Sequence, residues 1–476
     1  MAEREPVTNV LAERYASPEM RAMWSPRTRV VAERRFWLDV LRAQRAYGVD
    51  VPDGVIEDYE AAVEQVDLDD IAQRERVTRH DVKARIEAFN ALAGHQHVHR
   101  AMTSRDLTEN VEQLLIRGSL ALLRDRAVAL LARLAERAAA LERLVVVGRT
   151  HNVPAQATTV GKRFADAGQE LLLALRRVEE LLDRYPLRGL KGPVGTQQDQ
   201  LDLLGDAERV EDLEVAVAER LGFREVLSSV GQVYPRSLDL DVVAALVQLA
   251  AGPSSLATTL RLMSGQGLVD EGTRAGQVGS SAMPHKVNTR SCERINGLMT
   301  VLTGHLTMVA GLAGDRWNEG DVSDSVVRRV ALRDAFLATD GLFETFLTVL
   351  TELTVFEAPV ARELSRELPF LATTRVLGAA VAKGMGREDA HAVIREHSLA
   401  VAARLRDDPT ADNDLLARLA AEDRLPLGED ELAGLVARPL ELVGTARRQV
   451  QVFVAAVEAI RKEHPRASAY QPRPIL

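Results

Sequence analysis

The sequence contains very little cysteine and few aromatic residues, and both shortages narrow what the protein can be. Its single cysteine, Cys292, excludes an internal disulfide and a zinc site built from several cysteines. Aromatic residues make up only 4% of the chain. Alanine, leucine, arginine and glutamate dominate instead, and because these residues have high helix propensity, the composition favours helices.

The chain also lacks an excess of positive charge and a long apolar run. Its 60 lysines and arginines are outnumbered by 69 acidic residues and are spread along the chain, so we expect no nucleic-acid partner. The sequence has no uninterrupted run of about 18 apolar residues and no apolar signal segment at its start, so we expect neither a membrane span nor secretion. Together with the lone cysteine, these shortages predict a cytoplasmic protein.

What the chain does contain is helical periodicity on a long scale. From Asp106 to Val147 it holds no proline and repeats apolar residues at helical spacing, which predicts one helix about 60 Å long. The apolar stripes look wider than a bundle within one chain requires, which predicts oligomerisation. The same periodicity predicts a central bundle of long helices from the segments 155–184, 238–264, 290–313 and 325–355.

Changes in helix length divide the chain into three predicted domains. These are an N-terminal helical domain over 1–105, a central long-helix bundle over 106–360 and a C-terminal helical domain over 361–476. Two segments, 186–205 and 272–288, are rich in glycine, serine and proline and are predicted to be loops. The second is longer than an ordinary connection, so it is the first place to look for chemistry.

The second loop ends in Gly279-Ser280-Ser281-Ala282-Met283-Pro284-His285-Lys286-Val287-Asn288. Its proline disfavours a helix. Lys286 and Asn288 can neutralise and hydrogen-bond a substrate carboxylate while its α-carbon becomes a carbanion. A solvated linker is the plain alternative for such a composition, but the run is similar to the GSSxMPxKxN signature loop of the fumarase/aspartase superfamily.

The resemblance extends to further stretches that occur in the superfamily's order. Thr78 to Val82, Val98 to Ser104 and Thr150 to Gln156 are similar to its HDV, H-x-x-x-T-S and T-H-x-x-P-A-Q segments. The Ala-Met-Pro-His-Lys version of the loop resembles the adenylosuccinate lyase family in particular. This resemblance implies an all-α, three-domain fumarase/aspartase-like fold with a homotetrameric helical core.

The resemblance also implies a reaction. Members of this family eliminate fumarate from adenylosuccinate, giving AMP, and from the related intermediate SAICAR, giving AICAR, in purine nucleotide biosynthesis. We therefore expect small-molecule nucleotide substrates and no metal or organic cofactor. The closest alternative is another lyase of the superfamily, acting on argininosuccinate, aspartate or a carboxymuconate lactone. A second alternative is a non-catalytic helical protein that has kept the scaffold.

By the same resemblance, individual residues receive roles. Ser280 is the base that takes the Cβ proton, Lys286 stabilises the carbanion, and His151 is the acid that protonates the leaving nitrogen. Glu293 pairs with His151, which would favour the imidazolium, and His80 belongs to the same catalytic group. Contacts to the nucleotide or the succinyl group are implied for Arg14, Tyr15, Arg79, Asp81, His99, Thr103, Ser104, Gln232, Asn288, Ser325 and Arg329.

Plainer interpretations of these motifs stand beside the functional ones. Thr103 with Asp106 fits a capping box at the start of the long helix. The alternating histidines between 95 and 99 resemble a metal cluster, but no carboxylate stands at a suitable spacing, so we expect no metal site. His151 alone reads as a half-buried residue at the start of a helix.

The chain departs from the family pattern at a few positions. Gly320 stands where family members usually carry an arginine that contacts substrate, and Arg105 and Thr289 replace a common serine and proline. If the pocket keeps the family's shape, Gly320→Arg should be tolerated.

The position of the motifs along the long helix predicts shared active sites. A helix of about 60 Å separates Thr103 from the His151 region, so one chain does not easily bring both together. Antiparallel packing of helices from several subunits would place the Thr103 end of one chain beside the His151 region of another. We therefore expect a homotetramer in which each active site combines residues of more than one chain.

Overall fold

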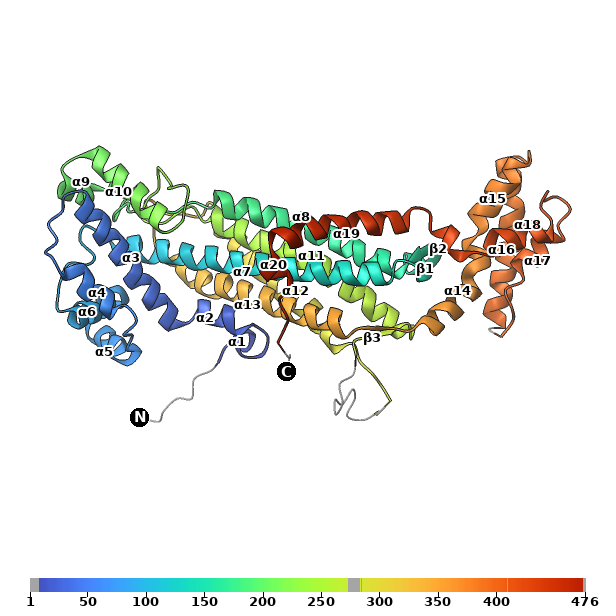
Figure 1. The fold of residues 1–476 in the computed structure, drawn as a ribbon, viewed down its shortest axis with the longest axis horizontal. Helices are drawn as coiled ribbons and strands as arrows, with labels where there is room; N and C mark the ends of the chain where they lie inside the picture. Colours follow the sequence, from blue (N-terminus) through green and yellow to red (C-terminus); the bar gives the residue numbers. More distant parts are fainter. Residues whose placement is uncertain (1–7, 273–282, 284, 409, 474–476) are drawn as a thin grey trace.

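The computed structural model describes residues 8–272, 283, 285–408 and 410–473. Long helices lie along the main axis of an elongated molecule, and a smaller group of helices occupies each end (Figure 1). Helices make up most of the described chain, and the strands form only short pairs. The all-α class predicted from the sequence is therefore confirmed.

The middle of the molecule is an antiparallel bundle of long helices. Successive helices of this bundle run in opposite directions, so three of them begin at the end of the molecule where the N-terminal helices lie (Figure 1). The bundle consists of α7 (Ser104–Ala140), α8 (Val160–Arg184), α11 (Ser237–Gly265), α12 (Arg290–Ala310) and α13 (Ser323–Glu352).

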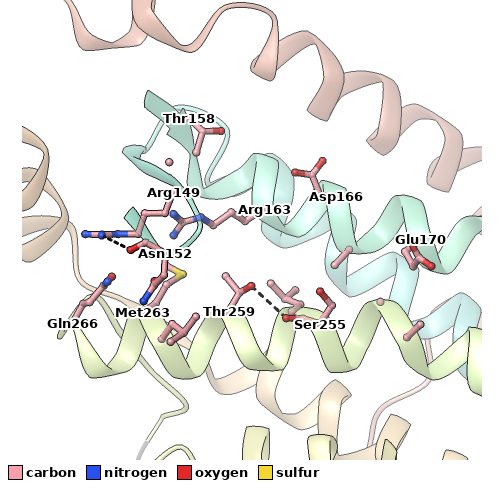
Figure 2. A pocket seen from close by; sticks show the side chains of 16 residues that line it. Arg149, Asn152, Thr158, Arg163, Asp166, Glu170, Ser255, Thr259, Met263 and Gln266 are labelled. Atoms are coloured by element: carbon pink, nitrogen blue, oxygen red, sulfur yellow. Dashed lines mark hydrogen bonds between the residues drawn. The ribbon is translucent and has the colours of Figure 1, made fainter. Parts of the chain in front are cut away.

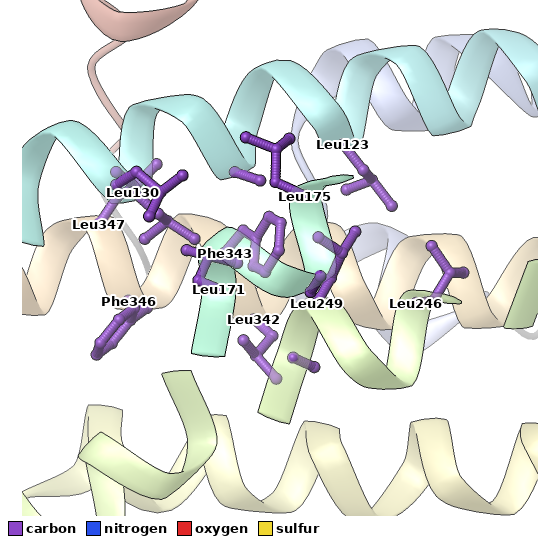
Figure 3. Packing of buried hydrophobic residues seen from close by; sticks show 14 of the residues in the cluster. Leu123, Leu130, Leu171, Leu175, Leu246, Leu249, Leu342, Phe343, Phe346 and Leu347 are labelled. Carbon is purple, nitrogen blue, oxygen red and sulfur yellow. The ribbon is translucent and has the colours of Figure 1, made fainter. Parts of the chain in front are cut away.

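Apolar side chains from these helices form the main core (Figure 3). Leu130 of α7, Leu171 of α8, Leu249 of α11 and Phe343 of α13 are fully buried in it. Because burying one such side chain stabilises a protein by roughly 1.5–3 kcal/mol, this core is the main source of the bundle's stability.

α11 is the most apolar helix of the bundle. By length and composition alone it could cross a membrane, with a mean hydropathy of 1.5 over its most apolar window, and it is the one such helix among the described residues. It packs against α8, α12 and α13. Only 56% of that window is buried in the single chain, so part of α11 stays accessible, including Leu262 at its end.

A β-hairpin occupies the place where the sequence predicted the end of the first long helix. α7 ends at Ala140, and β1 (Val145–Thr150) pairs with β2 (Val153–Thr159) in antiparallel register. The valines from 145 to 147 are β-branched, which lowers their helix propensity and suits a strand. The predicted continuation of the helix to Val147 is therefore wrong.

The turn of this hairpin is made by His151 and Asn152. Both have positive φ angles, 53° and 61°, as a two-residue type I′ turn requires. α8 begins only at Val160, where the Thr159 hydroxyl caps it by accepting the Lys162 N–H at 3.1 Å. His151 thus stands at a hairpin tip and not at the helix start suggested by the sequence.

The N-terminal helices form a second core around the start of α7. Two later helices, α9 (Gln198–Leu204) and α10 (Ala207–Arg220), join this core. Segment 186–205 is therefore not entirely a loop, because Gln200 and Leu204 are buried on a short helix that Gly205 ends. The N-terminal helices are α1 (Val10–Arg14), α2 (Pro18–Met23), α3 (Pro26–Ala46), α4 (Val55–Ala62), α5 (Leu68–Thr78) and α6 (Asp81–Ala93).

The C-terminal helices form a separate core at the opposite end of the bundle. A short pair of strands, β3 (Val269–Asp270) and β4 (Thr354–Val355), stands where the bundle meets them. The final helices, α19 (Ala446–Glu463) and α20 (Pro465–Ser468), return to the bundle and pack on α7. The others are α14 (Glu357–Leu371), α15 (Thr373–Ala382), α16 (Arg387–Asp407), α17 (Leu415–Ala420), α18 (Glu429–Val436) and the 3-10 helix η1 (Pro439–Val443).

Candidate active site

Several predicted site residues converge on one cavity near the start of α7. The cavity has a volume of about 410 Å³ and lies between α7, α13 and the beginning of α6. Distant parts of the sequence supply its lining, so the fold brings them together. The predicted residues that line it are His80, Asp81, Ser104, Ser325 and Arg329.

His80 and Asp81 stand at the beginning of α6. The Nδ1 atom of His80 accepts a backbone N–H and caps the helix, and its Nε2 atom lies 3.4 Å from the Ser104 hydroxyl. Because Nδ1 accepts, Nε2 carries the proton and can donate to a ligand. Arg85 pairs with Asp81 and with the buried Glu33 beneath it, which fixes the Asp81 carboxylate at the edge of the cavity.

A buried network of charged side chains supports the cavity. Glu109 of α7 is fully buried and accepts hydrogen bonds from both terminal nitrogens of Arg236, at 2.8 and 3.0 Å. Arg328 of α13 donates to Asp239 at 2.7 Å and lies 2.8 Å from Glu112. Burial by itself would raise the pKa of Glu109, but Arg328 and Arg236 outweigh it and lower the pKa to about 2. These ionised groups tie α7, α11 and α13 together.

His99 and Thr103 lie beside the cavity rather than in its lining. The indole Nε1 of Trp37 donates to His99 Nδ1 at 3.1 Å. Burial lowers the pKa of His99 to about 4, although Asp106 opposes the change, so the ring is neutral at neutral pH. The Asp106 carboxylate accepts the Thr103 N–H at 2.8 Å, which is the contact expected of the predicted capping box.

Gln232 and Gly320 lie on two loops that contact each other. The Gln232 N–H donates to the Glu319 carbonyl at 2.8 Å. Gly320 has a φ of 151°, which L side chains rarely adopt, and a Cβ built on it would lie 3.1 Å from the Gln232 Cβ. This backbone therefore argues against the expected tolerance of Gly320→Arg. Arg79, also outside the cavity lining, ends α5 in the left-handed conformation and is exposed.

The predicted loop residues stand apart from this cavity, where α12 begins. Lys286 and Glu293 are exposed and Asn288 is half-buried. The Glu271 carboxylate accepts the backbone N–H of Cys292 at 2.6 Å and so caps α12. Ser280, the predicted base, lies outside the described residues.

Tyr15 lies close to the first turns of α12. The guanidinium of Arg294 is 5.4 Å from the centre of the Tyr15 ring. Tyr15 also contacts α13, where a Cβ on Gly341 would lie 2.6 Å from the Tyr15 Cβ. The exposed Arg14 precedes Tyr15 at the end of α1. The structure thus places the predicted Arg14 and Tyr15 near the α12 end of the signature loop.

His151 is exposed at the tip of the hairpin. The hairpin also forms one side of a separate groove (Figure 2). This groove has a volume of about 670 Å³ and lies between the hairpin, α8 and α11. Arg149 and Asn152 line it on either side of His151, and Arg163 donates to the Val147 carbonyl at 2.8 Å. Within one chain, His151 stands at the hairpin tip and its predicted partner Glu293 stands in the first turn of α12.

Sequence reasoning missed the buried ionic network and Arg105. Charged residues stand at 109 and 112 on α7, among apolar residues that predict a buried helix face. A charged residue on a buried helix face indicates a buried ion pair, but the sequence does not show which of the many arginines pair with these glutamates. Among the described residues, no group of three or more His, Cys, Asp or Glu side chains is arranged to hold a metal ion.

Family models match the chain over most of its length. Residues 34–304 match the model described as Lyase, and residues 369–453 match the model described as Adenylosuccinate lyase C-terminus. The first of these matches alone spans more than half of the chain, and the second falls within the C-terminal helices.

Curated relatives and solved structures agree with these matches. Adenylosuccinate lyase of Saccharomyces cerevisiae is 36% identical over 463 residues, which is 95% of each chain. Adenylosuccinate lyase of Schizosaccharomyces pombe is 34% identical over 450 residues, which is 93% of each chain. The solved fumarate lyase from Mesorhizobium sp. BNC1 has a TM-score of 0.80 at 21% identity and covers 94% of this chain and 100% of its own.

A second solved structure shares the fold. The 3-carboxy-cis,cis-muconate lactonizing enzyme from Pseudomonas putida also has a TM-score of 0.80 at 21% identity, covering 97% of this chain and 100% of its own. The helical bundle and the family match therefore define a lyase of the fumarase/aspartase-like class. Within this class, the chain belongs to the adenylosuccinate lyase family.

Proposed function

We propose that the chain eliminates fumarate from adenylosuccinate and from SAICAR, as the names of its relatives suggest for the first substrate. The observation that carries this proposal is the cavity at the start of α7. It gathers His80, Asp81, Ser104, Ser325 and Arg329 from distant stretches of the chain. Hydroxyl, imidazole and guanidinium donors around one space suit a substrate with several anionic groups.

The cavity is the place we assign to the phosphate of the nucleotide. Arg329 is exposed, and among the described residues it has no carboxylate partner at ion-pair distance. Its planar guanidinium can bond two phosphate oxygens at once. His80 on the opposite wall can donate to the remaining oxygen, and Ser325, one helical turn earlier on α13, can do so once its hydroxyl turns from Asp324 to the ligand. A tetrahedral group uses such donors better than a planar carboxylate does.

The chemical steps fall to the residues around the signature loop and the hairpin tip. Ser280 takes the proton from the carbon next to one carboxylate, and Lys286 with Asn288 stabilises the negative charge that flows into that carboxylate. His151 protonates the departing nitrogen, and the carbon–nitrogen bond breaks to give fumarate and the purine nucleotide. The exposure of His151 at a hairpin tip leaves its ring available to a substrate.

These groups meet, in our proposal, only in a homotetramer. The 37 residues of α7 run about 55 Å, and they separate Ser104 from the hairpin that carries His151. The partly uncovered α11 and the groove of about 670 Å³ beside it offer a surface on which a second copy can pack. An antiparallel neighbour would bring its α7 start toward this chain's hairpin.

A spectrophotometric assay of the purified chain tests the proposed function. Adenylosuccinate and SAICAR should both be converted with release of fumarate, while argininosuccinate should not react. Turnover of argininosuccinate at a comparable kcat/KM, or no turnover of adenylosuccinate by a folded oligomer, would contradict the proposal.

A further inference from the structure

Arg105 bridges α7 and α13 across the wall of the cavity. Its Nη2 atom donates to the Ser325 hydroxyl at 3.0 Å, and its Nη1 atom donates to the Glu109 carboxylate at 3.1 Å. Its side chain is 15% exposed, and the residue lines the same cavity as Arg329. Arg105 therefore joins the buried ionic network to Ser325 by hydrogen bonds on both sides from the α7 wall. Asp324, which accepts from Arg236 and from Ser325, makes a second link on α13.

The Glu109 end of this bridge is rigid. Glu109 is fully buried and also accepts hydrogen bonds from Arg236, while Arg328 lies within 3.4 Å. Its carboxylate stays ionised because these arginines hold its pKa far below the usual range. The hydrogen bond to Glu109 therefore holds the Arg105 guanidinium in place. A side chain that is already held in place loses little conformational entropy when a ligand binds.

Arg105 lines the cavity and has N–H groups that its two hydrogen bonds within the protein do not use. Arginine carries more N–H groups than the two hydrogen bonds of Arg105 use. The Ser325 hydroxyl accepts from Arg105 and donates to Asp324 at 3.2 Å, so these two residues together set its orientation. Arg329 supplies a second guanidinium from α13 to the same space.

We infer that Arg105 is a specificity-determining residue that makes the enzyme select 5′-phosphorylated substrates. It donates to the substrate phosphate from the α7 wall, opposite Arg329, and it holds the Ser325 side chain beside the same group. This inference rests on the proposed function, in which the cavity takes the phosphate. A purely structural Arg105, tying α7 to α13, would affect every substrate alike.

The test compares two substrates in two proteins. Arg105→Met keeps most of the side-chain length but removes every donor. Its kcat/KM for adenylosuccinate should fall about ten- to hundredfold, mainly through a higher KM, because charge-assisted hydrogen bonds to the phosphate are lost. For the 5′-dephosphorylated substrate, succinyladenosine, the variant should stay within about twofold of the native enzyme.

Further variants make the comparison decisive. Arg133→Met removes another arginine of α7, which is paired with Glu136 at 2.9 Å outside the cavity, and it should change neither substrate's kinetics. Arg105→Lys keeps the charge and should lose less than Arg105→Met. It also serves as the test protein if the methionine variant fails to fold. Calorimetric titration with AMP and adenosine gives the same comparison if succinyladenosine turns over too slowly.

The outcomes separate the two claims. An equal loss for phosphorylated and dephosphorylated ligands, or no loss for either, overturns the role of Arg105 while leaving the proposed function in place. A native protein that is folded but inactive with adenylosuccinate overturns the proposed function instead. Selective loss for the phosphorylated ligands supports both.

Discussion

The carboxylate of Asp340 accepts a hydrogen bond from the backbone N–H of Ser17 at 2.5 Å. This contact joins the middle of α13 to the segment that follows Arg14 and Tyr15. Asp340 is fully buried, and its other oxygen has no hydrogen-bond partner. The buried Asp340 carboxyl group therefore anchors the segment that carries Arg14 and Tyr15, two residues proposed to bind substrate.

Asp340 should make stability fall as the pH rises. Burial raises its pKa to about 7, Glu344 adds to the rise, and Ser17 and Arg126 oppose it. Its unfolded pKa is about 3.9, so the stabilising contribution of the protonated group is complete below about pH 4 and is lost as the pH rises through about 7. The native protein should therefore lose on the order of 1–3 kcal/mol of unfolding free energy between pH 5 and 8 through this group, and Asp340→Asn should not show this loss. Denaturant titrations across this range check the prediction, and identical slopes for both proteins would refute it.

Gly341→Ala should displace Tyr15 without unfolding the bundle. The new methyl group would lie 2.6 Å from the Tyr15 Cβ and 3.0 Å from its carbonyl carbon, so the segment must move. We expect KM to rise severalfold with a smaller change in kcat, because Arg14 and Tyr15 are proposed to bind substrate. Gly378→Ala in α15 is the matched control. Nothing lies within 4 Å of that position, and the change should leave kinetics unaltered while adding about 0.5–1 kcal/mol to stability. A KM equal to the native value in Gly341→Ala would show that this segment does not contact substrate.

Gly320→Arg should lower both stability and activity. Its φ of 151° is strained for any L side chain, and the Cβ would press on Gln232. We expect a loss of about 1–3 kcal/mol in unfolding free energy together with a raised KM. Thermal unfolding and steady-state kinetics check both parts. Native stability with tighter substrate binding would instead show that the loop rearranges to accept the side chain.

Glu109→Gln should be among the most damaging single changes in the bundle. It removes the charge that faces Arg236 and Arg328, and leaving buried arginines partly unpaired destabilises a protein by about 3–5 kcal/mol. The depressed pKa of Glu109 contributes stability that is present above about pH 4.5 and is lost as the pH falls toward about 2. Denaturation of the native protein and the variant at neutral pH and at pH 3 should show the difference shrinking in acid. A difference that does not depend on pH would mean that shape, not charge, explains the effect.

The long helices of the fold could be predicted from the sequence, because their position depends mainly on the burial of apolar side chains. Apolar spacing identified the long helices, because a buried stripe repeats every turn along tens of residues. It failed at residues 141–159, where a run of valines continued the apolar pattern although the backbone had already left the helix. The positive φ angles of His151 and Asn152 leave no signal in composition, since neither residue is glycine.

The site could be predicted only in part and through resemblance. His80 and Ser104 stand in motifs, Ser325 and Arg329 follow from the family resemblance, and the fold brings all four to one cavity. The supporting ion pairs could not be predicted, because Glu109 finds partners more than 100 residues away and the pairing depends on how helices align. Residue spacing also could not reveal that Arg105 reaches Ser325.

The central claim is that each active site combines residues from several copies of the chain, and mixing two inactive variants tests it most directly. His151→Ala and Ser280→Ala should each be inactive alone. After mild dissociation and joint reassembly, activity should return to about a quarter of the native value, because random shuffling gives that fraction of sites an intact histidine and an intact serine. Mixed-label chromatography confirms that the subunits exchange. Exchange without any return of activity would mean that one chain supplies both residues to each site, and the shared-site account would be wrong.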